Sequence, residues 1–186
     1  MAKQDVTQIP EPKISRLLFA DTRLSFLWFI IRLYVGWEWI VAGYEKIINP
    51  VWVGPQAGKA LTGFLMGAVN KAGGAHPDVQ GWYAEFLKTS IISHASLFSY
   101  IVSFGELLVG VALILGLFTG IAAFFGAFMN MNYLLAGTVS INPVLFVLEL
   151  FLILAWRIAG WVGLDRYMLP FFGTPWRPGK LFKDKW

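Results

Sequence analysis

The sequence predicts an all-α polytopic membrane protein: a bundle of four transmembrane helices with a short helical outer cap. Three observations support this class. The 186 residues are 57% hydrophobic and only 14% charged, whereas soluble domains average about 45–50% and about 25%. The nine Trp and sixteen Phe are an aromatic content typical of proteins that meet two lipid interfaces. Four apolar stretches approach or exceed the roughly 20 residues that a transmembrane helix needs. We interpret the whole chain, 1–186, as a single membrane domain.

The four expected spans cover residues 24–48, 91–117, 120–136 and 143–161. Turn-forming residues punctuate the last three, as expected at helix ends: Gly116, Gly120, Gly137 and Pro143. The connection 49–90 is long for a structureless loop, and its apolar spacing predicts two short helices, over 56–69 and 81–88. This outer cap is interpreted either as a passive layer on the membrane surface or as a lid over a site.

The distribution of Lys and Arg predicts the orientation of the bundle. Four spans place both termini on one side, and nine basic residues flank the spans there: Lys3, Lys13, Arg16, Arg23, Arg166, Arg177, Lys180, Lys183 and Lys185. The cap carries Lys59, Lys71 and Lys88. The positive-inside rule therefore predicts that both termini, including the tail 162–186, are cytoplasmic. The net charge of +4 is explained in this way without a nucleic-acid partner.

Missing residue types exclude several kinds of chemistry. The chain has no Cys, which excludes disulfides, thiol nucleophiles, attached c-type haem and Cys-ligated iron–sulfur clusters within it. His76 and His94 are the two histidines, too few for a His-rich metal or b-haem site. We expect no metal or haem in this chain.

Charged residues inside the spans need partners, because each costs roughly 2.5–3.5 kcal/mol at mid-bilayer. Counted at 1.5 Å per residue, Arg32 lies about 12 Å and Glu106 about 16 Å above the inner ends of their spans. These similar depths predict an Arg32–Glu106 ion pair. The pair either locks two helices together or contributes to a site.

Polar side chains from all four spans are expected in the outer half of the bundle, and we predict that they surround one outward-facing cavity. Its residues are Glu38, Trp39, Lys46, His94, Asn130, Asn132 and Glu149. Buried carboxyl groups can move protons at neutral pH, so Glu38 and Glu149, with His94, are the catalytic candidates. Lys46, Asn130 and Asn132 suit a small anion, and Trp39 offers a flat apolar wall for a quinone. The alternative is that these groups only join helices by hydrogen bonds.

Three segments resemble the DoxX/DoxD membrane proteins: RLYVGWEWIVAGYEKIINP (32–50), the run from 98 to 143 that ends in NMNYLLAGTVSINP, and AGWVGLDRYMLP (159–170). The resemblance covers residues 19–172 and is closest to the DoxD-type subunit of thiosulfate:quinone oxidoreductase. It implies a four-helix protein of the prokaryotic cytoplasmic membrane. It also implies oxidation of thiosulfate to tetrathionate, with membrane quinone as electron acceptor, and a DoxA-like second subunit as a possible partner.

Two other functions stay open at this stage. The chain could be a non-enzymatic scaffold or accessory subunit for a redox partner, with the cap as its docking surface. It could also transport a small anion, although four spans are few for an independent carrier and no inverted repeat is visible. A homo-oligomer would answer the first of these objections.

Overall fold

The computed structural model describes residues 10–174 and 177–181, and its secondary structure is helical apart from one hairpin of two two-residue strands. Of the basic residues used for the orientation, Lys3, Lys183 and Lys185 lie outside the described residues. The N-terminal part consists of α1 (Lys13–Ala20) and the 3₁₀ turn η1 (Thr22–Leu24). The C-terminal part consists of α8 (Asp165–Phe172) and the hairpin of β1 (Gly173–Thr174) with β2 (Arg177–Pro178).

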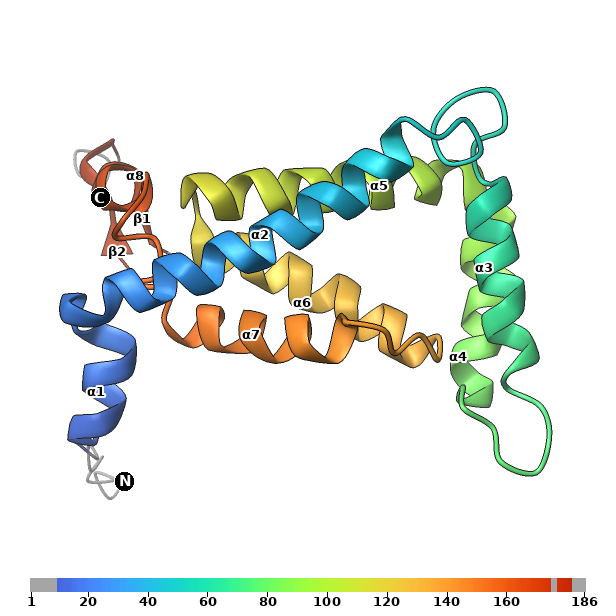
Figure 1. Cartoon of the computed structure of the whole chain (residues 1–186), viewed down its shortest axis with the longest axis horizontal. Helices are drawn as coiled ribbons and strands as arrows, with labels where there is room; N and C mark the ends of the chain where they lie inside the picture. Colours follow the sequence, from blue (N-terminus) through green and yellow to red (C-terminus); the bar gives the residue numbers. More distant parts are fainter. Residues whose placement is uncertain (1–9, 175–176, 182–186) are drawn as a thin grey trace, which may run out of the picture.

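Four antiparallel helices form the body of the molecule (Figure 1): α2 (Ser25–Ile47), α5 (Ala95–Leu115), α6 (Thr119–Leu135) and α7 (Asn142–Leu154). α2 packs mainly on α5, and α6 packs mainly on α7. The helices α1 and α8 lie at one end, which we call the termini end. The helices α3 (Lys59–Asn70) and α4 (Gly81–Phe86) lie at the other, the cap end.

Two helical stretches are long and apolar enough to cross a membrane, Thr22–Ile47 and Gly81–Leu115. The second comprises α4, the π-helical turn η2 (Leu87–Ile91), the 3₁₀ turn η3 (Ile92–His94) and α5. π and 3₁₀ turns are where helices bend, and here they let the chain turn from the cap into the bundle (Figure 1). The helix α7 is a shorter apolar helix of 13 residues.

The cap has its own small hydrophobic core. Leu61, Leu65 and Ala68 form the buried face of α3. On α4 the buried residues are Tyr83 and Ala84, whereas Trp82 is 65% exposed. Because Val79 and Ala136 also enter this cluster, the cap is packed onto the last turn of α6.

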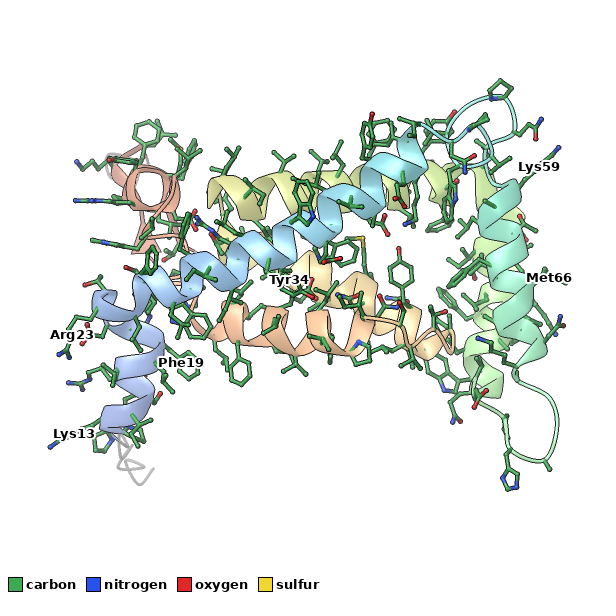
Figure 2. The ribbon with its side chains drawn as sticks, viewed as in Figure 1. Lys13, Phe19, Arg23, Tyr34, Lys59 and Met66 are labelled. Atoms are coloured by element: carbon green, nitrogen blue, oxygen red, sulfur yellow. The ribbon has the colours of Figure 1, made fainter. Side chains whose placement is uncertain are left out.

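The outward faces of the bundle helices are apolar, and Figure 2 shows their side chains pointing away from the helix axes. On α6 and α7 the exposed large hydrophobic residues are Ile121, Phe124, Phe125, Phe128, Met131, Val144, Val147, Leu150, Phe151 and Leu154. An apolar exterior of this extent is unusual for a soluble monomer and is typical of a protein surrounded by lipid.

Glycines fix how closely α2 approaches α5. A Cβ on Gly43 would lie 2.5 Å from the backbone nitrogen of Leu107, and a Cβ on Gly110 would lie 2.6 Å from that of Ile40. Both contacts are with backbone atoms, which cannot move aside as a flexible side chain can. The register of the two helices is therefore set by these glycines.

We expect Gly43→Ala to destabilise the protein by about 1–3 kcal/mol, because the added methyl group overpacks the α2–α5 contact. The matched control is Gly63→Ala on α3, where an added Cβ meets nothing within 4 Å. That change should be neutral or stabilising by about 0.5–1 kcal/mol, since Gly weakens a helix interior. Thermal unfolding in detergent measures both, and equal effects would contradict the proposed packing.

Candidate functional site

Glu149 on α7 is fully buried and is held by two neutral donors. The indole Nε1 of Trp39 donates to its Oε1 at 2.5 Å, and the Nδ2 of Asn130 donates to its Oε2 at 2.7 Å. Gly126 leaves the space for this carboxyl, because a Cβ there would collide with Glu149 Oε1. Three helices, α2, α6 and α7, thus position one carboxyl group, and no ion pair to it is formed by the described residues.

Asn130 is also fully buried, and only one side of its amide has a partner. Its Oδ1 accepts no hydrogen bond from any described residue. A buried acceptor without a partner is costly and rare, and it usually marks a place where water or a ligand binds. The amide therefore offers one unused acceptor directly beside Glu149.

A second buried carboxyl, Glu106 on α5, has a charged partner instead. Lys46 Nζ lies 2.7 Å from its Oε2, and the hydroxyl of Tyr133 donates to its Oε1 at 2.5 Å. Lys46 also lies over the ring of Trp52, with Nζ 5.3 Å from the centroid. The lysine keeps 21% of its side chain exposed, whereas Glu106 keeps 1%.

Tyr133 brings these two polar clusters next to each other. Its ring centroid is 6.5 Å from that of Trp39 and 6.1 Å from that of Phe64, a cap residue on α3. The cap is also tied to α6 through the hydroxyl of Tyr83, which donates to Asn132 Oδ1 at 3.0 Å. The cap therefore covers the Tyr133 side of the site. We call the two clusters with Tyr133 the core polar site.

The predicted Arg32–Glu106 ion pair is wrong. The Gly43 contact with Leu107 places Glu106 level with the end of α2, whereas the Arg32 guanidinium packs against Gly116 at the other end of α5. Ten residues, or roughly 15 Å of helix, separate these two levels. The prediction counted the depth of each residue from the inner end of its own span. The relative register of α2 and α5 is set instead by the contacts of Gly43 and Gly110.

Arg32 instead holds the turn region after α7. Its Nη2 donates to the carbonyl of Val162 at 2.6 Å, and its Nε and Nη1 have no partner among the described residues. Nearby, Asp165 accepts from the backbone N–H groups of Phe118 and Thr119 at 2.5 and 2.9 Å. The fourth helix ends at Leu154 and not at 161 as predicted. The AGWVGLDRYMLP segment lies at the termini end and is held there by these contacts.

Three other predicted site residues form no hydrogen bond with Glu149 or Glu106. His94 is exposed, with its Nδ1 3.1 Å from the Ser90 carbonyl on the same segment. The Nδ2 of Asn132 donates to Phe128 O within α6. Glu38 is half-buried and makes no hydrogen bond within the part of the chain that the structure describes. Of the seven predicted residues, Trp39, Asn130 and Glu149 are brought together, and Lys46 lies in the neighbouring cluster.

Tyr133 and Gly126 were missed by the sequence reasoning, although a signal for them was present. Gly126, Asn130 and Tyr133 are spaced i, i+4, i+7 and therefore share one face of α6. Tyrosine in a membrane helix is usually assigned to an interface, and that assignment hides the polar character of this face. Glu106 was noticed as a buried charge but was given the wrong partner.

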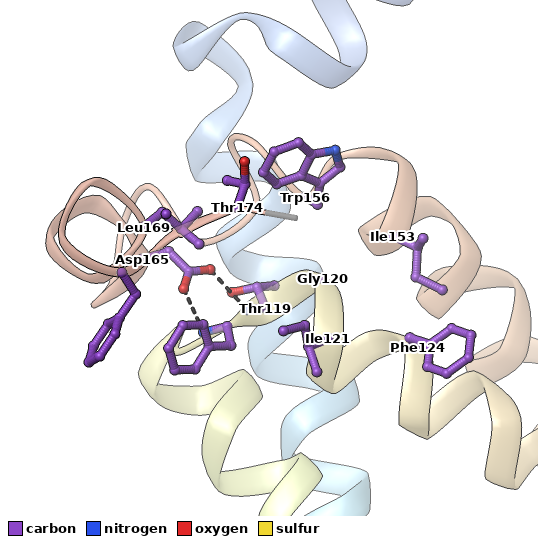
Figure 3. Close-up of a pocket in the computed structure, with 12 residues that line it drawn as sticks. Thr119, Gly120, Ile121, Phe124, Ile153, Trp156, Asp165, Leu169 and Thr174 are labelled. Atoms are coloured by element: carbon purple, nitrogen blue, oxygen red, sulfur yellow. Dashed lines mark hydrogen bonds between the residues drawn. The ribbon is translucent and has the colours of Figure 1, made fainter. Parts of the chain in front are cut away.

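The structure also has a cavity of about 490 Å³, which lies at the termini end between α6, α7 and α8 (Figure 3). A second hollow, of about 410 Å³, lies at the cap end beside Gly58 and Ser96. Among residues 10–174 and 177–181, no group of three or more His, Asp or Glu side chains could hold a metal ion.

The comparisons with known proteins give one match. No curated protein and no solved structure matches the chain. The DoxX family model matches residues 27–137, which include α2, the cap, α5 and α6 and thus three of the four bundle helices. This match extends over more than half of the sequence, and the chain belongs to the DoxX family.

Proposed function

We propose that this protein is a membrane oxidoreductase of the DoxD type, which passes electrons from thiosulfate to membrane quinone. The observation that carries the proposal is Glu149, a fully buried carboxyl bound by Trp39 and Asn130 beside an unused amide acceptor. The DoxX family fits a membrane protein with a redox role.

The reaction balances as follows. Two thiosulfate dianions each lose one electron, and a sulfur–sulfur bond forms between them to give tetrathionate. One quinone gains these two electrons and two protons and becomes the quinol. The protein must therefore admit an anion from one side, hold the quinone ring and deliver protons to its two oxygens.

The core polar site offers a group for each of these tasks. Glu149 delivers one of the two protons to a quinone oxygen, the second proton comes from water, and the Trp39 indole provides a flat apolar wall. Lys46, with its exposed part at the cap end, attracts the anion. Glu106 neutralises the lysine when no anion is present, so that no bare charge stays buried.

We infer that α2, α5, α6 and α7 all cross the cytoplasmic membrane of a prokaryote, with both termini inside. At 1.5 Å per residue, the 17 residues of α6 span roughly 25 Å, a little less than the 30 Å hydrocarbon core. The apolar outward faces of α6 and α7 support this inference, and so do the charges Arg16, Arg23, Arg166 and Lys180 at the termini end.

Cysteine labelling tests this topology cleanly, because the chain has no Cys of its own. We expect Gly73→Cys and Val139→Cys to react with an impermeant maleimide in intact cells. Lys180→Cys should react only after permeabilisation. Reaction of Gly73→Cys and Lys180→Cys from the same side would contradict the four-span arrangement.

An accessory role is the second candidate, and one observation favours it. Trp82 and Phe86 on α4 are 65% and 43% exposed at the cap end, as in a surface that docks a partner such as a DoxA-like subunit. Under this alternative the chain would be inactive alone and active after its partner is added.

A donor panel tests the proposed function. The purified protein is mixed with a water-soluble quinone analogue, and quinol formation is followed by absorbance with thiosulfate, sulfite, sulfide or no donor. We expect reduction with thiosulfate alone. Equal rates with every reduced sulfur donor, or none with thiosulfate, would contradict the proposal.

A further inference from the structure

The cavity at the termini end is formed by three separate segments and has the size of a ligand site. Its volume of about 490 Å³ is within the range of roughly 300–1,000 Å³ that ligand pockets occupy. Figure 3 shows Ile153 and Phe124 at one end, with Trp156, Thr174 and Leu169 toward the other. Most of this lining is apolar, so the cavity suits a hydrocarbon chain better than a soluble ion.

The cavity continues into the lipid-facing exterior of the bundle. Ile121 and Phe124 line it, yet each leaves 55% of its surface exposed on α6. Aliphatic and aromatic residues of α6 and α7 extend from there toward the cap end. A chain that enters from the bilayer can therefore reach the cavity sideways without crossing a polar layer.

Two exposed arginines directly follow cavity residues in the sequence, and no described residue forms an ion pair with either. Arg157 directly follows the cavity residue Trp156, and its guanidinium lies 5.8 Å from that ring. Arg166 directly follows the cavity residue Asp165 and lies 5.3 Å from the Trp161 ring. Neither makes an ion pair among residues 10–174 and 177–181.

Arg23, at the same end, shows the contrasting case. It forms an ion pair with Asp21 at 2.6 Å, and this contact lowers the pKa of Asp21 to about 2. Asp165 forms no ion pair with Arg157 or Arg166. It is buried, and its two oxygens accept hydrogen bonds from the backbone N–H groups of Phe118 and Thr119.

We propose that this cavity binds one anionic phospholipid, with an acyl chain along Phe124 and Ile153 and the phosphate beside Arg157 and Arg166. The proposal uses the membrane placement inferred above but not the thiosulfate reaction. Lipid tails are as apolar as the cavity, so the chain alone gives little selectivity. Selectivity comes from the headgroup, since each cation near the surface strengthens anionic lipid binding about fivefold.

Native mass spectrometry of the detergent-purified protein tests the proposal, with equal amounts of dioleoyl phosphatidylglycerol and dioleoyl phosphatidylcholine added. We expect one phosphatidylglycerol to be retained, with at least fivefold preference. Arg157→Gln with Arg166→Gln should remove most of that preference. Ile153→Trp, which fills the apolar end, should lower retention of the lipid while leaving both arginines in place.

Arg16→Gln is the matched control, because it removes an exposed cation of α1 at the same end but not beside the cavity. It should leave the retained lipid unchanged. Equal retention of the two lipids, or an equal loss in Arg16→Gln, would overturn the site and leave the membrane placement intact. Thermal unfolding of each variant shows whether it is folded. If Ile153→Trp does not fold, Arg157→Gln with Arg166→Gln still tests the proposal, because both arginines are exposed on the surface.

Discussion

Replacing Lys46 by Met is expected to destabilise the protein by about 3–5 kcal/mol, because the change leaves Glu106 as an uncompensated buried charge. Glu106 is 1% exposed, and its partners are Lys46 at 2.7 Å and the Tyr133 hydroxyl. Glu106→Gln should cost a similar amount, since it strands the lysine and alters the bond from Tyr133. The double variant should cost less than either single change.

Thermal unfolding in detergent of the two single variants and the double variant measures this coupling. Lys59→Met is the matched control: this exposed lysine begins α3, and its contact is Gln56 Oε1 at 3.4 Å. The control should shift stability by less than about 0.5 kcal/mol, as surface substitutions usually do. Strictly additive effects of Lys46 and Glu106 would show that the two residues are not coupled.

Glu149→Gln is expected to slow quinone reduction by about 10²–10⁴-fold, the usual contribution of a positioned acid or base. The change keeps the shape of the side chain. Its amide can still accept from Trp39, while Asn130 can rotate to present its unused Oδ1 to the new NH₂ group. Stability should therefore change little while turnover falls, and the pH dependence of kcat should be lost.

The control for this variant is Glu85→Gln, an exposed carboxyl on α4. It should leave both kcat and its pH dependence unchanged. A Glu149→Gln protein that unfolds early would point to a structural carboxyl. A well-folded variant with full activity and an unchanged pH profile would remove Glu149 from the mechanism.

Much of the fold follows from local sequence signals. The apolar stretches and their glycines placed α5 and α6 within a few residues, because Gly116 adopts a left-handed conformation and ends α5 as a glycine cap does. The end of α7 was not predictable in this way. The segment that follows α7 is held instead by Arg32 and Asp165, which bond to backbone atoms far away in sequence.

The core polar site was predicted only in part, because some of its contacts depend on how the helices pack against one another. Trp39, Asn130 and Glu149 were identified because buried polar groups must find partners. Their contacts do not depend on the α2–α5 register alone, since α6 and α7 carry two of the three residues. The partner of Glu106 did depend on that register, and the register is set by Gly43 meeting a backbone, a contact no single-helix pattern contains.

The most direct test of the proposed function is the joint stoichiometry of both products in one preparation. The purified chain alone, in detergent with phospholipid, is given thiosulfate and a quinone analogue, and tetrathionate and quinol are quantified together. We expect one tetrathionate for each quinol, with both products lowered in parallel in Glu149→Gln. Quinol without tetrathionate, or neither product from a folded protein, would contradict it.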